Sequence, residues 1–320
     1  MPFATQFVAA TTETTPGTWI SPSFAADTII TRNMTVEPIR AQTLRRNIDQ
    51  PFAGARPSIP SAIHRAYSYE VELIGSGTAN TAVTWQALLR AALFGAGVPT
   101  GVQVGYPLIS TGDGGSISQL LLEDTLLHEA LGCRHNLVFN FPEKGYPFIK
   151  VDGLGQFRTA GQVYAAGSSA GLVLPTAAPA PVEVNLENTV ISLDGFTLGV
   201  RNFSLDLGLG PELYSTTNQR VIIFGSSDEK DRRGAKFSVT FELPDSASKN
   251  YSSVIVAGTQ IAFSLTHGLV AGNIIQLASA SAIVEGLTYS RESNRVFATM
   301  TGVMVPTGAA GNNEFTFVTK

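Results

Sequence analysis

Alternating apolar and polar residues predict that most of this chain is β-structure. In residues 67–73, tyrosine, valine and leucine alternate with serine and glutamate, which is the pattern of a strand with one buried face. In residues 135–141 the same alternation places three apolar side chains on one face and two asparagines on the other. Shorter runs predict further strands at residues 148–151, 219–224, 236–243, 260–266, 273–277, 295–300 and 314–318.

Two hairpins are predicted between neighbouring strands. Residues 117–123 and 126–130 are separated by a turn near Asp124. Residues 189–193 and 196–200 are joined by Asp194-Gly195, a dipeptide typical of a type I′ turn.

The second hairpin also contains a break in its pattern. Its apolar phase shifts by one residue after Val200. A β-bulge near Arg201-Asn202 would reconcile the two phases, so we predict one there.

One segment has the period of a helix. Trp85, Leu88, Leu89, Ala92 and Leu93 form a single apolar stripe. We predict a helix over residues 81–94, capped by Asn80 or Thr81, with Gly95 in the left-handed conformation beyond its end. A short second helix is predicted within residues 245–256. The expected fold is mainly β, a β-sandwich or barrel-like sheet with one packed helix.

The N-terminal segment, residues 1–66, differs from the rest of the chain. It is polar, rich in threonine and proline, and weakly periodic, and all its basic residues are arginines. Its prolines disfavour helix. We predict an extended arm with one or two short strands near residues 28–39, followed by a β-rich domain over residues 67–320. Residues 260–320 are either part of that domain or a small β subdomain.

The charge content is low for a soluble chain. Charged residues make up 14 % of the 320 residues, against roughly 25 % in ordinary soluble domains. The formal net charge is -4, which disfavours a dedicated nucleic-acid binder. Low charge is what a subunit needs when much of its outside is buried against copies of itself.

The sequence predicts no compartment signal, disulfide or anchor. Cys133 is the single cysteine, so no internal disulfide framework can form. No secretion signal follows Met1, and no apolar run reaches the ~18 residues of a membrane span. We therefore expect synthesis in a cytoplasm, without a membrane anchor.

No residue cluster predicts catalysis, a cofactor or a metal. Residues 167–171 spell G-x-S-x-G around Ser169, but the strand and helix that this motif needs are not predicted around it. His128, Cys133 and His135 lack a fourth ligand at proper spacing. The mixed-charge run 228–234 is interpreted as a solvated or interface loop.

The order of these features resembles the tail tube (major tail) proteins of bacteriophages with long, non-contractile tails, the siphophage type. Within the segment 125–134, residues 127–134 follow an L-x-x-x-x-G-x-R pattern that is similar to a strand of that family. The resemblance covers nearly the whole chain. Its other motifs are Gly17-Thr18 with residues 27–36, the strand 67–73 with the helix ending at Gly95, residues 188–195 continuing to 202–208, and residues 311–317.

The resemblance implies a structural virion protein whose hexameric rings stack into a tube that conducts DNA into the host during ejection. Its partners would be itself, the tape-measure, tail-terminator and distal-tail proteins, and DNA passing through the lumen without specific binding. Its location would be the virion tail, after the host cytoplasm. Two sets of candidate residues follow: lumen-facing Glu123, Asp124, Glu129, Asp194 and Asp206, and inter-subunit arm residues Arg32, Arg40, Arg45, Arg46 and Arg56.

Three alternative functions stay open. One is a tube protein of a contractile tail or a secretion apparatus. The second is a carbohydrate-binding or adhesive β-sandwich module, although Trp19 and Trp85 are few for such a role. The third is a hydrolase built on Ser169, which the absence of a motif context disfavours.

Overall fold

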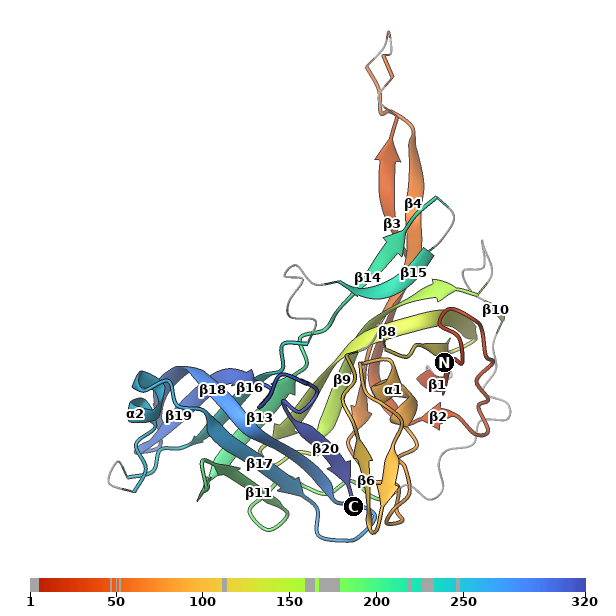
Figure 1. The fold of residues 1–320 in the computed structure, drawn as a ribbon. Coiled ribbons are helices and arrows are strands. Elements are labelled where there is room, and N and C mark those ends of the chain that lie inside the picture. Colours follow the sequence, from red (N-terminus) through yellow and green to blue (C-terminus); the bar gives the residue numbers. More distant parts are fainter. Residues whose placement is uncertain are drawn as a thin grey trace.

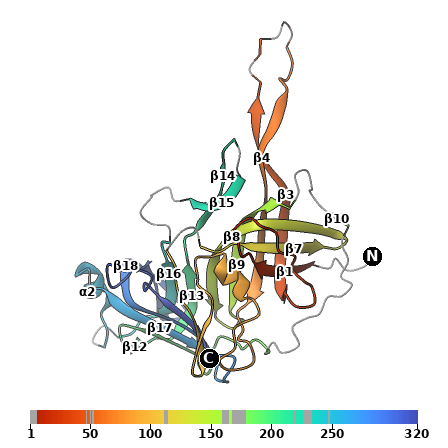
Figure 2. The same cartoon turned by 45° about the vertical axis from the view of Figure 1, so that its right-hand side comes forward.

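A computed structural model describes residues 6–46, 48–49, 51, 53–110, 114–158, 165–166, 179–217, 220–225, 233–245 and 248–320. Within these ranges the chain forms twenty strands and two short helices, so the predicted mainly-β fold is confirmed. In Figure 1 the N-terminal strands lie on one side of the molecule, most of the blue C-terminal part extends to the other side, and a long β-ribbon rises from the N-terminal side. The same ribbon stands clear of the body in Figure 2.

The larger sheet is antiparallel and crosses the whole molecule. Its order follows the pairings β3–β4–β9–β8–β13–β16–β19–β18. The strands are β3 (Thr31–Arg45), β4 (Ser58–Glu72), β9 (Phe148–Phe157), β8 (Leu126–Pro142), β13 (Val200–Asp206), β16 (Lys236–Glu242), β19 (Arg295–Met304) and β18 (Ile275–Glu292). The N-terminal half of β8 also carries β7 (Ile117–Glu123), β1 (Gln6–Thr12), β2 (Thr28–Ile29) and β10 (Ala165–Ala166).

A second layer is connected to the first through the bend of β18. The first part of β18, residues 275–278, pairs with β17 on one side and β20 on the other. Its second part, residues 282–292, pairs with β19 of the larger sheet. The second layer has the order β11–β17–β18–β20–β6–β5. Its other strands are β11 (Thr189–Leu193) with β12 (Phe196–Thr197), β17 (Ile261–His267), β20 (Thr316–Thr319), β6 (Gln103–Tyr106) and β5 (Val98–Thr100). Residues 260–320 are thus hydrogen-bonded into both layers.

A small separate hairpin packs on the larger sheet. It consists of β14 (Gly210–Ser215) and β15 (Arg220–Gly225). The buried Arg134 guanidinium donates to the Ile222 carbonyl at 2.6 Å and lies over the Phe224 ring. These contacts fix the hairpin against β8.

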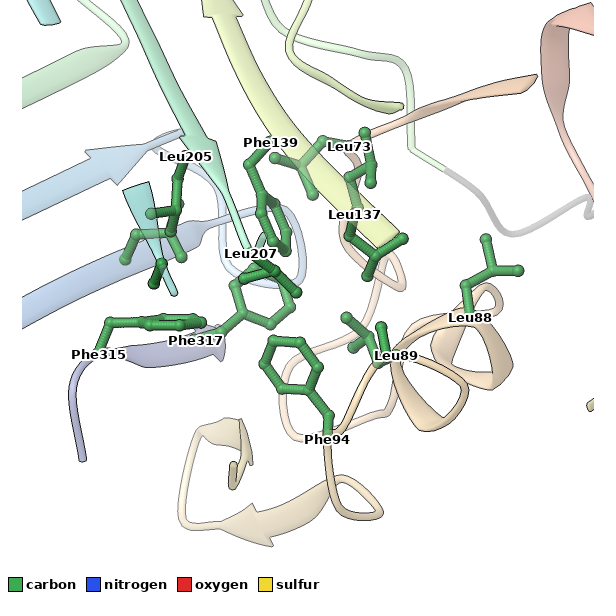
Figure 3. Packing of buried hydrophobic residues seen from close by; sticks show 14 of the residues in the cluster. Leu73, Leu88, Leu89, Phe94, Leu137, Phe139, Leu205, Leu207, Phe315 and Phe317 are labelled. Atoms are coloured by element: carbon green, nitrogen blue, oxygen red, sulfur yellow. The ribbon is translucent and has the colours of Figure 1, made fainter. Parts of the chain in front are cut away.

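Aromatic residues fill the space between the layers. Phe317 on β20 contacts Trp85, Phe94, Tyr106 and Phe139, with ring centroids 5.4–6.4 Å apart. Figure 3 shows Phe94, Phe139 and Phe317 converging with leucines of β8, β13 and the first helix. Because all five rings are buried, this cluster joins the two layers.

The predicted helix is much shorter than expected. The helix α1 covers only Gln86–Arg90, although the whole apolar stripe is buried as predicted. The preceding residues form i→i-3 turns, and the β-branched Thr81, Val83 and Thr84 disfavour a longer helix. Leu93, rather than Gly95, adopts the left-handed conformation at φ 60°. Its carbonyl accepts bonds from Ile109 and Arg233, which hold this uncommon geometry.

Other local predictions are confirmed. Asp194 and Gly195 have φ of 51° and 75°, as a type I′ turn requires. The pairing of β13 with β16 shifts register between Val200 and Asn202, where the bulge was predicted. The second helix, α2 (Tyr251–Val256), begins at Asn250, whose side chain accepts from the Ser253 amide.

The N-terminal segment is not a detached arm. Strand β1 lies between β2 and β7, with Val8 and Ala9 fully buried. Strand β4 runs without a break through residue 66, where we predicted the end of the arm. The extended part of the chain is instead a ribbon of two long strands, β3 and β4.

Candidate assembly surface

The β3–β4 ribbon is the most exposed feature of the fold. Strand β4 pairs with β9 from Arg65 to Glu72, but among the described strands its residues 58–64 pair with β3 alone. The outer part of the ribbon therefore extends beyond the sheet, as Figures 1 and 2 show. We call residues 37–63 the ribbon tip.

The base of the ribbon is anchored by charge and burial. The Arg32 guanidinium pairs with the Glu70 carboxylate at 2.8 Å and lies over the Phe148 ring. The Asn33 amide donates to the same carboxylate, and Met34 is buried. Arg32 therefore makes an intramolecular ion pair, and its contact with a neighbouring subunit stays a prediction.

A buried arginine marks the point where the ribbon leaves the sheet. The Arg65 guanidinium donates to the Glu129 carbonyl and lies 5.0 Å from the centre of the Phe157 ring. Burial lowers the pKa of Arg65 to about 10, which still leaves it protonated at neutral pH. Together the two anchors hold the direction in which the tip projects.

The ribbon tip carries aliphatic side chains in water. Leu44 and Ile59 are cross-strand partners, 59 % and 56 % exposed, so their side chains form one apolar spot. Ile39 and Ile48 are also exposed on the same tip. Several exposed aliphatic residues on one projecting element indicate a protein interaction surface.

The remaining predicted arm arginines lie on the same ribbon tip. Arg40, Arg45, Arg46 and Arg56 are all exposed residues of the tip. The tip contains four arginines and two carboxylates, Glu37 and Asp49, so its formal charge is positive. Arginine forks of this kind suit ion pairs across an interface.

The predicted lumen residues do not form one cluster. Glu123 ends β7 and Asp124 forms the β7–β8 turn, while Glu129 pairs with Arg158 at 3.0 Å nearby on β8. Asp194 lies in the β11–β12 turn, paired with Lys249. On β13, Asp206 accepts a bond from the Asn136 amide at 2.7 Å. Their orientation toward a lumen stays a prediction.

Residues considered for chemistry have structural partners where they are described. The ring of His135 lies 2.7 Å from the Leu88 carbonyl and 3.3 Å from the Tyr67 hydroxyl. Cys133 is fully buried, and burial raises the pKa of its thiol well above the usual range. Among the described residues no three histidine, cysteine or acidic side chains gather as a metal site. Ser169 lies outside the described residues.

One residue of the mixed-charge run has a definite place. The Arg233 side chain is only 5 % exposed, pairs with Glu314 at 2.6 Å and donates to the carbonyls of Leu93 and Ile109. It therefore ties the end of the α1 region to the residues just before β20, a packing role within the subunit, whereas we predicted a solvated or interface loop for the whole run 228–234. The residues 226–232 lie outside the described ranges.

Two buried histidines predict acid sensitivity. Burial lowers the pKa of His135 and of His267 to about 4, whereas an unfolded histidine titrates near 6.5. The unfolded state therefore binds more protons as the pH falls from about 6.5 to 4, and the folded state loses stability over that range. For His135 the expected loss is on the order of 3 kcal/mol at pH 4.

Urea unfolding at several pH values between 7.5 and 4 measures this loss. His135→Gln should flatten the pH dependence, and His64→Gln, at a partly exposed position of β4 next to the tip, should leave it unchanged. A wild-type stability that is level from pH 7 to 4.5 would contradict the prediction.

The aliphatic spot was missed by the sequence analysis. Leu44 and Ile59 are isolated apolar residues in a polar segment with prolines. Apolar residues in a polar segment that forms no core indicate side chains left exposed for a partner, and this is the signal in the sequence that could have located the spot.

Comparisons with known proteins do not extend the sequence resemblance. A scan of protein-family models finds no match, and neither does a search of curated proteins. Across the described ranges, no helix has the length and apolar character that crossing a bilayer requires.

Proposed function

We propose that this chain is the tube subunit of a long, non-contractile bacteriophage tail, which assembles into hexameric rings that stack around a DNA-conducting lumen. The observation that carries the proposal is the anchored β3–β4 ribbon, whose tip holds exposed aliphatic residues and arginines away from the body. An element of this kind has no evident use in a monomer, because its exposed apolar side chains gain only when another chain covers them.

Open strand edges support self-assembly. Among the described strands, β3 pairs only with β4, and its other edge meets β1 at the base, where the Gln6 side chain donates to the Met34 carbonyl. Beyond this base, the outer edge of β3 has no strand partner among the described residues. Edge strands of this length promote pairing between chains unless something covers them. In a ring of identical subunits, neighbouring copies would cover these edges.

The low charge content fits the same function. With 14 % charged residues, the surface has less electrostatic repulsion against contact between copies than an ordinary domain. The net charge of -4 also disfavours retention of DNA, since a strongly basic lining would bind phosphates. The proposed partners are therefore other copies, the tape-measure, tail-terminator and distal-tail proteins, and DNA in transit, in the virion tail.

Electron microscopy of the purified chain tests this proposal. We expect rings or tubes with an open centre, formed without any other protein. A protein that stays monomeric at high concentration and binds glycans would instead support the adhesive module. Tubes surrounded by a contractile sheath in the parent virion would support the contractile alternative.

A further inference from the structure

A second exposed apolar surface lies at one end of the second layer, which is formed by β11, β17, β18, β20, β6 and β5. The register aligns Thr189, His267, Ile275, Thr319 and Val104 in one row across neighbouring strands. The loops connected to this row of residues all lie at the same end of the second layer. They are residues 183–188 before β11, residues 268–274 between β17 and β18, and the β5–β6 turn at 101–102. We call these loops the rim.

Each loop of the rim exposes aliphatic residues. Leu186, Leu269, Val270 and Val102 are 69–89 % exposed. Beside them Val98 lies on the edge strand β5 and is half exposed. A groove of about 320 Å³ adjoins the rim, lined by residues of β5, β6 and β20 that include Val98, Thr100 and Val318.

The central loop of the rim is rigidly held. The Asn273 side chain accepts from the Gly75 amide and donates to the Ala180 carbonyl. The Gly272 amide donates to the Lys320 carbonyl, and a side chain at Gly272 would collide with Gly77, 2.5 Å from its Cβ position. Leu269 and Val270 are therefore presented on a preformed support, which reduces the entropy lost on binding.

The rim and the ribbon tip lie at opposite ends of the molecule. In both Figure 1 and Figure 2 the tip is uppermost, and the β5–β6 and β17–β18 loops are at the bottom. Their charges are also complementary. Glu183 and Glu187 flank Leu186, while the tip carries four arginines and two carboxylates. The backbones of two lysines, Lys144 and Lys320, are hydrogen-bonded to the rim loops, so the complementarity is confined to the Glu183–Glu187 segment.

We infer that the rim is the receptor for the ribbon tip of a second copy of this chain, an inference that rests on the proposed function. The Leu44–Ile59 spot would cover the rim aliphatics, with tip arginines near Glu183 and Glu187. The two surfaces differ and lie at opposite poles, so the contact is heterologous and repeats without closing on itself. Successive copies would then stack in one direction along the tube axis.

Charge substitutions on the two surfaces test the inference. The rim variant is Leu269→Asp with Val270→Asp, and the tip variant is Leu44→Asp with Ile59→Asp. Val256→Asp is the control, because Val256 is 89 % exposed on α2, away from both surfaces. The rim variant should need about a hundredfold higher concentration to form tubes, while circular dichroism stays that of the wild type and the control assembles normally.

Mixing the two variants gives the sharper result. The rim variant keeps an intact tip, and the tip variant keeps an intact rim. An equimolar mixture should therefore form complexes that contain both variants but do not grow into tubes. Sedimentation velocity and native mass spectrometry would detect these mixed complexes. Two results overturn the inference: a rim variant that forms tubes like the wild type, or a mixture without any mixed complex. In either case tubes of the wild type would leave the proposed function standing, whereas a monomeric wild type would refute both.

Discussion

Replacing Leu44 and Ile59 together by aspartate is expected to abolish assembly without unfolding the chain. The two side chains are cross-strand partners at the ribbon tip and are more than half exposed, so the substitution removes little packing within the subunit. In an assembled tube the two carboxylates would be buried without partners, at a cost of several kcal/mol per contact. The concentration needed for assembly should rise at least about a hundredfold, as measured by pelleting and negative-stain microscopy.

A matched control exists on the same element. Thr43 pairs with Pro60 in the next register position and faces the other side of the ribbon. Thr43→Asp adds a carboxylate of the same kind to the tip and should reduce assembly much less. Equal loss in both variants would show that charge on the tip, rather than the aliphatic spot, controls assembly.

A shortened ribbon gives the same test without added charge. Arg40 and His64 are cross-strand partners, so Asn-Gly in place of residues 41–63 would close the ribbon with a two-residue turn. Deleting the whole segment 2–59 would be a poor test, because it also removes β1 and the buried Val8 and Ile29. The shortened chain should stay folded and monomeric.

The second large effect is expected in the core. Phe317→Ala should lower the free energy of unfolding by about 3–5 kcal/mol, the usual range for a buried phenylalanine. The loss is large because Phe317 contacts four other rings from three parts of the chain, and its removal leaves a cavity between the two layers.

Urea unfolding of Phe317→Ala is best measured in the shortened, monomeric background, since assembly itself stabilises the folded state. Val318→Ala is the matched control, because Val318 is the next residue of β20 and is only partly buried. A loss below about 1 kcal/mol for Phe317→Ala would show that the aromatic cluster does not join the layers.

Local chemistry made parts of the fold predictable. The Asp194-Gly195 turn and the bulge near Asn202 depend on residues adjacent in sequence, and both are present. The apolar stripe from Trp85 to Leu93 was likewise assigned to the core correctly. Its helix was overestimated because periodicity reports which side is buried, not whether the backbone forms α-helical or tighter turns.

Long-range pairing could not be predicted in the same way. The bend of β18 between two layers depends on β17, β19 and β20, which are distant in sequence. The sequence predicts an arm in place of the ribbon, because the outer parts of β3 and β4 face solvent on both sides. Their residues therefore do not alternate between apolar and polar. The rim was missed for a similar reason: its loops come together only through the register of the second layer.

The central claim is that this chain assembles with itself, through the ribbon, into an open tube. Electron cryomicroscopy of the purified full-length chain at assembly concentration tests it most directly. The predicted result is stacked rings of six copies around a lumen wide enough for a DNA duplex, with the β3–β4 ribbon of each copy covered by a neighbour. A monomer, or an assembly that has no lumen and leaves the ribbon in solvent, would contradict the claim.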